Sequence, residues 1–254
     1  MPGSRKAVAK AAPLVQNPRA NLVFQVSERL ARVPSDREVP VEAGKAIVFV
    51  IDDEPSVRKA LARLLRSAGQ QVETFASAED FLKREHHDGP GCLVLDVRMP
   101  GVTGLDLQHA LAKAEYALPI VFISGQSDIP TSVRAMKAGA VDFLPKPFRD
   151  RDLLEAIQRS LAKARQARAA QAEIRAIQAR IQALTPRERE VMLLVVTGML
   201  NKQIGFELGI SEKTVKVHRA RVMEKMRADS VAELVRLAEK VGISAPRGSP
   251  GRAN

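Results

Sequence analysis

Five short apolar runs, each followed by a segment with helical spacing, constrain the fold of this chain most strongly. The runs cover residues 46–51, 71–74, 92–95, 120–123 and 141–144. After the first run, Val57, Leu61 and Leu64 recur at the spacing of one helix face. Successive strand–helix units are typical of a parallel sheet with helices on both faces. We therefore predict an α/β domain over 46–162, built as a (βα)5 doubly wound parallel sheet.

Polar side chains stand at or just after the carboxyl ends of four of these runs. In chain order they are Asp52, Asp53, Asp96, Ser124 and Lys146. Because the carboxyl ends of parallel strands meet at one edge of a sheet, we expect these side chains to lie together. Taken singly, each has an ordinary explanation, such as a helix start for the acids or a surface charge for the lysine. Taken together, they suit a hard cation and an anion.

The residue types at this edge match the chemistry of phosphoryl transfer. Carboxylates at Asp53 and Asp96, with a carbonyl and water, suit octahedral Mg²⁺. With the metal neutralising charge, a phosphoryl group can approach an acidic pocket that otherwise repels it. Asp96 is then the expected nucleophile, and Ser124, Lys146 and the metal are expected to hold the phosphoryl oxygens.

Four stretches resemble the receiver domain of two-component response regulators: VFVIDDEPSVRKAL, LVLDVRMPGVTGLDL, PIVFISG and AMKAGAVDFLPKPF. The resemblance runs over nearly all of residues 46–162. It implies that Asp96 is the phosphoacceptor, that Ser124 is the switch hydroxyl and that Lys146 is the invariant lysine that receivers carry at the phosphorylation site. It also implies a cis peptide bond between Lys146 and Pro147.

The same resemblance implies a metal site. Mg²⁺ is expected on Asp53, on Asp96 and on the backbone carbonyl of Arg98, with Asp52 taking part indirectly.

The aspartate-nucleophile phosphohydrolases offer another interpretation, but those enzymes need a second Asp two residues after the nucleophile, where this chain has Arg98. We therefore expect that the chain is not an enzyme, and that the receiver catalyses only its own phosphorylation and dephosphorylation.

Phe143 stands where receivers carry their aromatic switch residue, although simple core packing also explains it. Phosphorylation is expected to draw Ser124 toward the phosphoryl group and to let Phe143 move inward. The surface of the helix over 128–138 and of the fifth strand is then remodelled.

The segment after residue 150 is helical in pattern, without Pro or Gly, and predicts a linker helix over 163–183. Four apolar residues in it follow a 3-4-3 spacing, namely Ile174, Ile177, Ile181 and Leu184. A stripe packed within the chain and a dimeric coiled coil both explain this spacing.

A second compact segment covers residues 184–245 and reads as four short helices. The helical patterns span 186–196, 202–208, 212–226 and 231–241. A tight turn at Gly209, with Ser211 as the next cap, is typical of a helix-turn-helix. Helical spacing turns Val215 inward, together with His218 as a hydrogen-bonded packing residue, and leaves Lys213, Lys216, Val217, Ala220 and Glu224 outward.

The stretch LTPREREVMLLVVTGMLNKQIGFELGISEKTVKVHRARVMEKM is similar to the LuxR-type helix-turn-helix. Joined to a receiver, it makes the NarL/FixJ class of response regulators, and FLPKPF with LTPRERE points to the FixJ-like branch. The resemblance implies base contacts at Lys216, Val217 and Ala220 and dimerisation through the final helix. The DNA-binding residues that it implies are Lys202, Lys213, Thr214, Lys216, Val217, Ala220 and Arg221.

The two ends of the chain are weakly patterned. We predict a basic, disordered extension over 1–45, with a short helix over 22–33, and a disordered tail over 246–254. A transit peptide has a similar basic start, but the bacterial character of the motifs favours a plain extension. The net charge of +11 lies outside the slightly acidic 46–148, so we expect the second half to meet a polyanion.

Cysteine and hydropathy indicate the compartment. The single Cys92 allows no internal disulfide, and no apolar run approaches the length of a bilayer span. We expect a cytoplasmic protein with no membrane partner.

The expected function is transcription regulation switched by phosphorylation. A sensor histidine kinase donates the phosphoryl group to Asp96, and the chain then forms a homodimer and binds double-stranded promoter DNA. RNA polymerase is the expected further partner, and activation the expected direction. A DNA-binding regulator with a phosphorylation-independent receiver is the alternative, which the complete set of site residues disfavours.

Overall fold

The computed structural model describes residues 45–84, 87, 89–114, 116, 118–125 and 129–243. The predicted extension before Lys45, its short helix over 22–33 and the tail over 246–254 lie outside these residues. The chain divides after Ala167 into two compact units. We call them the sheet unit, up to Ala167, and the helical unit, from Arg168.

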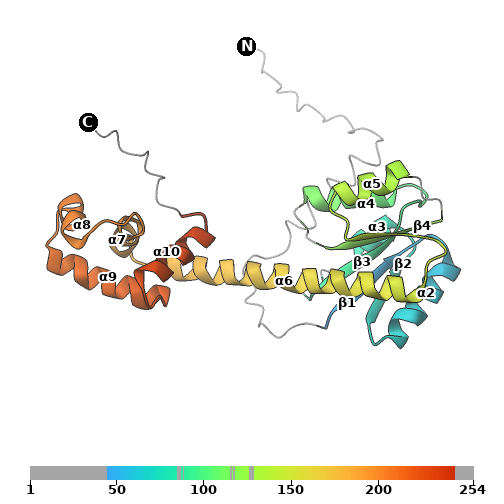
Figure 1. Cartoon of the computed structure of the whole chain (residues 1–254), viewed down its shortest axis with the longest axis horizontal. Helices are drawn as coiled ribbons and strands as arrows, with labels where there is room; N and C mark the ends of the chain where they lie inside the picture. The colour runs from blue at the N-terminus through green and yellow to red at the C-terminus, as the bar shows by residue number, and fades with distance from the viewer. Residues whose placement is uncertain are drawn as a thin grey trace, which may run out of the picture. The chain divides into compact units, whose positions relative to one another are not determined.

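The sheet unit contains a parallel sheet (Figure 1). The sheet has five strands in the order β2-β1-β3-β4-β5. The strands are β1 (Ile47–Ile51), β2 (Gln71–Phe75), β3 (Gly91–Asp96), β4 (Ile120–Ser124) and β5 (Asp142–Pro145). Each predicted strand ends within one residue of the observed one. The central strands β1, β3 and β4 are buried along their whole length, as expected for a sheet covered on both faces. The predicted doubly wound parallel sheet is confirmed.

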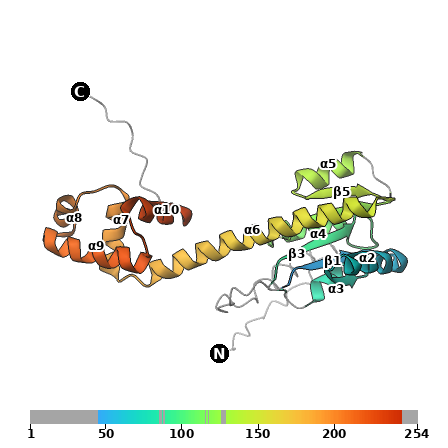
Figure 2. The same cartoon turned by 60° about the horizontal axis from the view of Figure 1, so that its bottom comes forward.

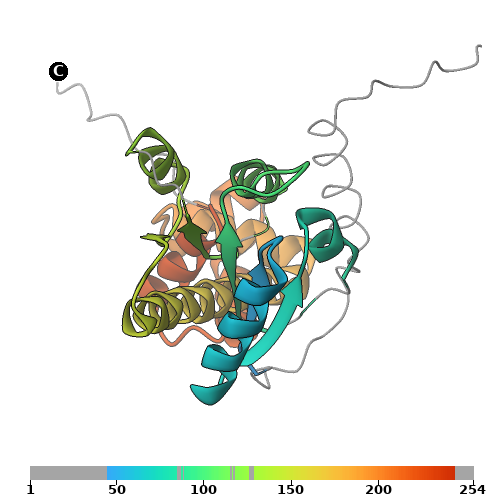
Figure 3. The same cartoon turned by 90° about the vertical axis from the view of Figure 1, so that its right-hand side faces the viewer.

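Helices cover both faces of this sheet (Figure 3). They are α2 (Pro55–Ser67), α3 (Ala78–Lys83), α4 (Gly104–Lys113), α5 (Ile129–Lys137) and the start of α6 (Asp150–Gln182). Leu61 of α2 and Leu153 of α6 pack with Val48 on one face, whereas Phe81 of α3 and Leu107 of α4 pack on the other. The two apolar layers fix the strand ends on which the polar residues stand.

The helical unit is formed by the end of α6 and four short helices (Figure 2). These are α7 (Pro186–Val196), α8 (Asn201–Leu208), α9 (Glu212–Met226) and α10 (Val231–Lys240). Gly209 ends α8 in the left-handed region, with φ of 63°. A Cβ on Gly205 would lie 2.8 Å from the carbonyl oxygen of Ile210, so only glycine lets α8 approach the turn this closely. The predicted all-α domain is confirmed.

The last turns of α6 pack into the core of the helical unit. Ile177, Ile181 and Leu184 are buried there, and Ile174 is half-buried. Arg180 donates from Nη1 to the carbonyl oxygen of Met226, at the end of α9, over 3.2 Å. Of the two explanations of the 3-4-3 spacing, the stripe packed within the chain therefore describes these residues. No helix in the described part of the chain has the length and apolar character to cross a membrane.

Candidate functional site

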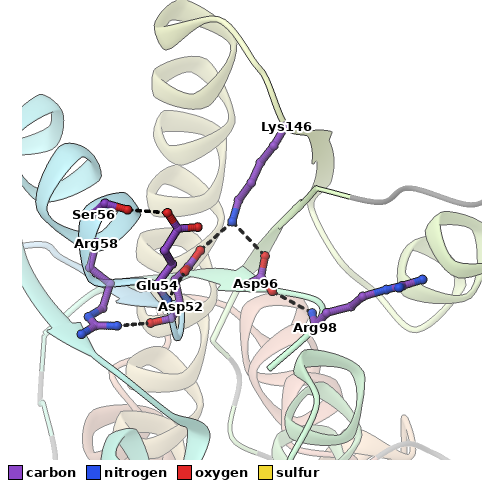
Figure 4. A network of polar contacts seen from close by, with 7 residues as sticks. All are labelled: Asp52, Glu54, Ser56, Arg58, Asp96, Arg98 and Lys146. Atoms are coloured by element: carbon purple, nitrogen blue, oxygen red, sulfur yellow. Dashed lines mark hydrogen bonds and ion pairs between the residues drawn. The ribbon is translucent and has the colours of Figure 1, made fainter. Parts of the chain in front are cut away.

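The carboxyl edge of the sheet brings together Asp52, Asp96 and Lys146, three of the residues predicted to meet there (Figure 4). Asp52 follows β1, Asp96 ends β3 and Ser124 ends β4, and all three side chains are buried. Asp53 is exposed, and its carboxylate has no hydrogen-bond or ion-pair partner among the described residues. Burial of two carboxylates at one edge is costly without a balancing charge.

Lys146 supplies that charge. Its Nζ donates to Asp52 Oδ2 at 2.7 Å and to Asp96 Oδ1 at 3.0 Å. Its backbone N–H donates to the carbonyl oxygen of Ser124 at 2.7 Å, which fixes the chain after β5 beside the end of β4. The peptide bond from Lys146 to Pro147 is cis, as predicted. One lysine therefore ties together the ends of four neighbouring strands.

Charges and burial shift the pKa of both partners. Burial raises the pKa of Asp96 above its ordinary value, against the opposing effects of the Lys146 ammonium and the Arg98 N–H. For Lys146, burial lowers the pKa, but the hydrogen bonds to Asp52 and Asp96 together outweigh it, and the net shift is upward. Lys146 therefore stays an ammonium at neutral pH and lies between Asp52 and Asp96.

Backbone groups and one further side chain hold the two buried acids. The Arg98 N–H donates to Asp96 Oδ2 at 2.8 Å, and the Glu54 N–H donates to Asp52 Oδ1 at 2.8 Å. Arg58 of α2 donates from Nη1 to the Asp52 carbonyl oxygen at 2.6 Å. Sequence reasoning missed Arg58, although its position in the helix that follows the acids was a signal for it.

Gly104 is a second residue of the site that the sequence analysis missed. A Cβ there would lie 2.3 Å from the carbonyl oxygen of Asp96, so α4 can start against the end of β3 only with glycine at this position. Thr103 caps α4 and forms a capping box with Asp106.

Glu54, next to the acidic pair, accepts from the hydroxyl of Ser56 at the start of α2, which fits a helix-start role.

The donors at this edge are oxygen atoms of carboxylates and of one backbone carbonyl. No group of three or more His, Cys, Asp or Glu side chains in the described ranges could hold a metal ion. The predicted Mg²⁺ set is smaller than that, since it has two direct carboxylates, Asp53 and Asp96, and the Arg98 carbonyl. Oxygen donors with one unpaired, exposed carboxylate fit a hard cation that keeps several waters. The residues fit Mg²⁺, and its binding stays a prediction.

Phe143 lies in the middle of β5, half-buried, and packs against the apolar layer that contains Phe122. The two ring centroids are 6.2 Å apart and the rings are tilted by 36°. This contact agrees with core packing and with a switch residue alike, so the switch role stays a prediction.

The second helix of the helix-turn-helix, α9, presents the residues predicted to face outward. Lys213, Lys216, Val217 and Ala220 are exposed, and we call these four residues the reading face. Lys202 on α8 and Arg221 are exposed too. Thr214 is half-buried, and its N–H donates to the Ser211 hydroxyl at 3.1 Å, so it belongs to the helix cap.

His218 was expected to be a hydrogen-bonded packing residue. It is half-buried on the inner side of α9, but within the described residues its Nδ1 is buried without a hydrogen-bond partner. The packing position was therefore right and the satisfied hydrogen bond was wrong.

An ion pair between half-buried Lys225 and buried Glu188 holds α9 to α7. Lys225 Nζ donates to Glu188 Oε2 at 2.6 Å and to the carbonyl oxygen of Ala183 at 3.3 Å. The Thr185 N–H donates to the same Glu188 oxygen at 2.9 Å. Lys225 first, and then Thr185, lower the pKa of Glu188 from its ordinary value of 4.5 to about 2. The pair fixes the helix that carries the reading face.

Two family models match the chain. The model described as "Response regulator receiver domain" matches residues 48–158, and the one described as "Bacterial regulatory proteins, luxR family" matches residues 182–238. The two matches fall on the parts of the chain that hold the acidic site and the reading face.

Relatives match both parts at once. Nodulation protein W of Bradyrhizobium diazoefficiens is 51% identical over 201 residues, covering 79% of this chain and 88% of that protein. The transcriptional regulatory protein FixJ of Rhizobium meliloti is 45% identical over 191 residues, covering 75% of this chain and 94% of that protein. The solved structure of the response regulator StyR has a TM-score of 0.68 and 50% identity, covering 78% of this chain and all of that one.

Proposed function

The chain belongs to the two-component response regulators that join a receiver domain to a LuxR-type DNA-binding domain, and we propose that Asp96 is its phosphoacceptor. Such proteins are transcription regulators and not enzymes. The observation that carries this proposal is the contact of Lys146 Nζ with both buried acids, Asp52 and Asp96. The carboxyl group of Asp96 therefore lies at the edge of the sheet between two donors, Lys146 Nζ and the Arg98 N–H.

In the proposed reaction, a carboxylate oxygen of Asp96 attacks the phosphorus of a phosphohistidine on a sensor histidine kinase. The new P–O bond forms as the P–N bond breaks, and the released imidazole takes up a proton. Lys146 and Ser124 donate to the phosphoryl oxygens, which neutralises part of their charge. Burial of Asp96 keeps water from competing with these donors.

Mg²⁺ is the proposed cofactor, held by Asp53, Asp96 and the Arg98 carbonyl, with Asp52 supporting indirectly. When bound, it supplies positive charge for the phosphoryl oxygens at an acidic edge. Asp53 supports this assignment because its carboxylate is exposed and unpaired among the residues described.

Phosphorylation is proposed to act through the surface formed by α5 and β5. Ser124 moves toward the phosphoryl group, Phe143 turns inward, and the remodelled surface favours a homodimer. Three large apolar side chains on α5 are exposed and fit such a surface: Ile129, Val133 and Met136. The helix over 128–138 was predicted, and α5 covers Ile129–Lys137, with Asp128 outside the described residues.

The dimer is proposed to bind promoter DNA in the cytoplasm of a bacterium, with α9 in the major groove. Lys216, Val217 and Ala220 contact bases, because a small apolar pair beside a lysine permits close approach to thymine methyls and guanine. The proposed contacts to the DNA backbone come from Lys202, Lys213 and Arg221. Thr214 supports these contacts through the cap of α9. The bound dimer is proposed to recruit RNA polymerase and so to activate transcription.

The test combines labelling and DNA binding. The full chain is incubated with acetyl phosphate and Mg²⁺, with Asp96→Asn as the control, and its dimerisation and affinity for promoter DNA are measured. Stable labelling of the wild type alone, with tighter DNA binding, supports the proposal. DNA binding without labelling points to a phosphorylation-independent receiver, and rapid turnover of many phosphomonoesters points to a phosphohydrolase.

A further inference from the structure

We propose that Glu212 reads DNA sequence together with Lys216, and that the two side chains recognise one G·C base pair as a unit. This inference rests on the proposed DNA-binding function and deepens it, because it assigns a base contact to an acidic residue outside the reading face.

The two side chains form an ion pair on the surface of α9. Lys216 Nζ lies 3.2 Å from Glu212 Oε1, across one helical turn, and the side chains are 64% and 49% exposed. Residues four apart on a helix share one side of it, so Glu212 projects from the same side of α9 as Lys216. The carboxylate and the ammonium are therefore held next to each other before DNA arrives.

Glu212 is not needed to cap its own helix. The Ser211 hydroxyl accepts from the Thr214 N–H at 3.1 Å, which is the usual N-cap hydrogen bond. Among the described residues, no backbone N–H of α9 donates to the Glu212 carboxylate. The exposed carboxylate thus pairs with Lys216 alone within the part of the chain that the structure describes.

The position of Glu212 brings it close to the bases. In a helix-turn-helix, the N-terminal residues of the second helix contact base edges. Glu212 is the first residue of α9, and Lys216 and Val217 follow one turn later. A carboxylate at this point meets either the base edges, where it can accept a hydrogen bond, or the phosphates, which repel it.

A G·C pair complements this ion pair. Guanine presents O6 and N7 as acceptors in the major groove, and cytosine presents its N4 amino group as a donor. O6 and N4 are partners in the base pair and lie side by side, as the ammonium and the carboxylate do. Lys216 donates to guanine while Glu212 accepts from cytosine, and the existing ion pair limits the side-chain freedom lost on binding.

The same carboxylate acts against other sequences. A T·A pair also places an acceptor, thymine O4, beside a donor, adenine N6, but the thymine methyl takes the place of guanine N7, so Lys216 keeps one acceptor instead of two. An A·T pair in the opposite orientation puts the adenine amino group beside the ammonium and thymine O4 beside the carboxylate, which leaves Glu212 desolvated and unpaired. Next to a phosphate, Glu212 offsets the attraction that Lys216 supplies. Specificity then comes both from the favourable contact and from the repulsive one.

The experiment is a selection from double-stranded DNA with a randomised segment, using the full chain after treatment with acetyl phosphate and Mg²⁺. Glu212→Gln is compared with wild type, and Glu190→Gln is the matched control. Glu190 of α7 forms a similar exposed ion pair with Arg187, so its loss changes the net charge equally without touching α9. Lys216→Ala tests whether Lys216 and Glu212 read the same base pair.

The expected result is a preference for G·C at one position of each half-site, weakened roughly fivefold or more by Glu212→Gln. Glu190→Gln keeps the wild-type preference, and Lys216→Ala loses preference at the same position as Glu212→Gln. An equal change of affinity for all sequences in Glu212→Gln, or an unchanged preference, overturns the inference while the DNA-binding function stands. A wild-type chain that selects no sequence overturns both.

Discussion

Lys146 reaches Asp52 across the edge of the sheet, with Nζ 2.7 Å from Oδ2, although 94 positions separate the two residues in the chain. The lysine joins the first strand end to the last. The charge balance of the acidic edge therefore depends on one side chain from the far end of the sheet unit.

Replacing Lys146 tests this dependence. We expect Lys146→Met to lower the rate of Asp96 labelling by acetyl phosphate about a hundredfold, as the loss of one charge-stabilising donor commonly does. Exposed Lys59 of α2 gives the matched control, since Lys59→Met removes the same charge away from the site. Equal labelling rates in both variants would contradict the proposed role of the ammonium.

Gln108 holds α4 to the end of α5. This buried side chain donates from Nε2 to the carbonyl oxygens of Ala135 and Ala138, at 3.1 and 3.2 Å. We expect Gln108→Leu to lower the free energy of unfolding of the sheet unit by about 1–3 kcal/mol, because both carbonyls lose their side-chain donor. Urea unfolding followed by far-UV circular dichroism measures the change, and exposed Gln71→Leu should stay within about 0.5 kcal/mol of wild type.

Ile177 tests the packing of α6 into the helical unit. It is 1% exposed, and its replacement by alanine leaves a cavity in that core. We expect Ile177→Ala to destabilise the helical unit by about 2–5 kcal/mol. Hydrogen exchange of peptides from α7 and α9 measures this loss, with half-buried Ile174→Ala as a milder comparison. A loss that appears only when protein concentration is raised would support the coiled coil instead.

Glu188 makes the helical unit sensitive to acid. Its pKa is lower in the folded chain, about 2 against an ordinary 4.5, so its ionised form stabilises the fold above pH 4.5. That stabilisation is lost as the pH falls from 4.5 toward 2. We expect Glu188→Gln to be less stable than wild type at neutral pH by about 1–3 kcal/mol, because Lys225 loses its buried partner.

Thermal unfolding at several pH values distinguishes this effect from a general loss of stability. The difference between Glu188→Gln and wild type should shrink as the pH falls from 4.5 toward 2. A difference that stays constant over this range would show that the ion pair does not carry the stabilisation. Glu190→Gln is the control, because its ion pair with Arg187 is exposed.

The sequence by itself determined the elements and most of the acidic site. Apolar runs of strand length alternate with helical spacing, and this periodicity fixes which faces are buried, so the strand ends could be placed to within one residue. Because parallel strands end at one edge, Asp52, Asp96 and Lys146 could be expected to meet. These inferences rely on local pattern and on the topology that the pattern requires.

Only the tertiary structure decided which partner each polar group takes. Arg58 binds the Asp52 carbonyl, Lys225 binds Glu188, and Gln108 binds α5. For Lys225 and Gln108 the sequence has no signal beyond residue type, and for Arg58 it has only the position in the helix after the acids. The 3-4-3 spacing fitted two kinds of packing equally well until Ile177 was found in the core of the helical unit. Periodicity shows that a face is buried, whereas the partner of that face depends on contacts between residues far apart in the chain.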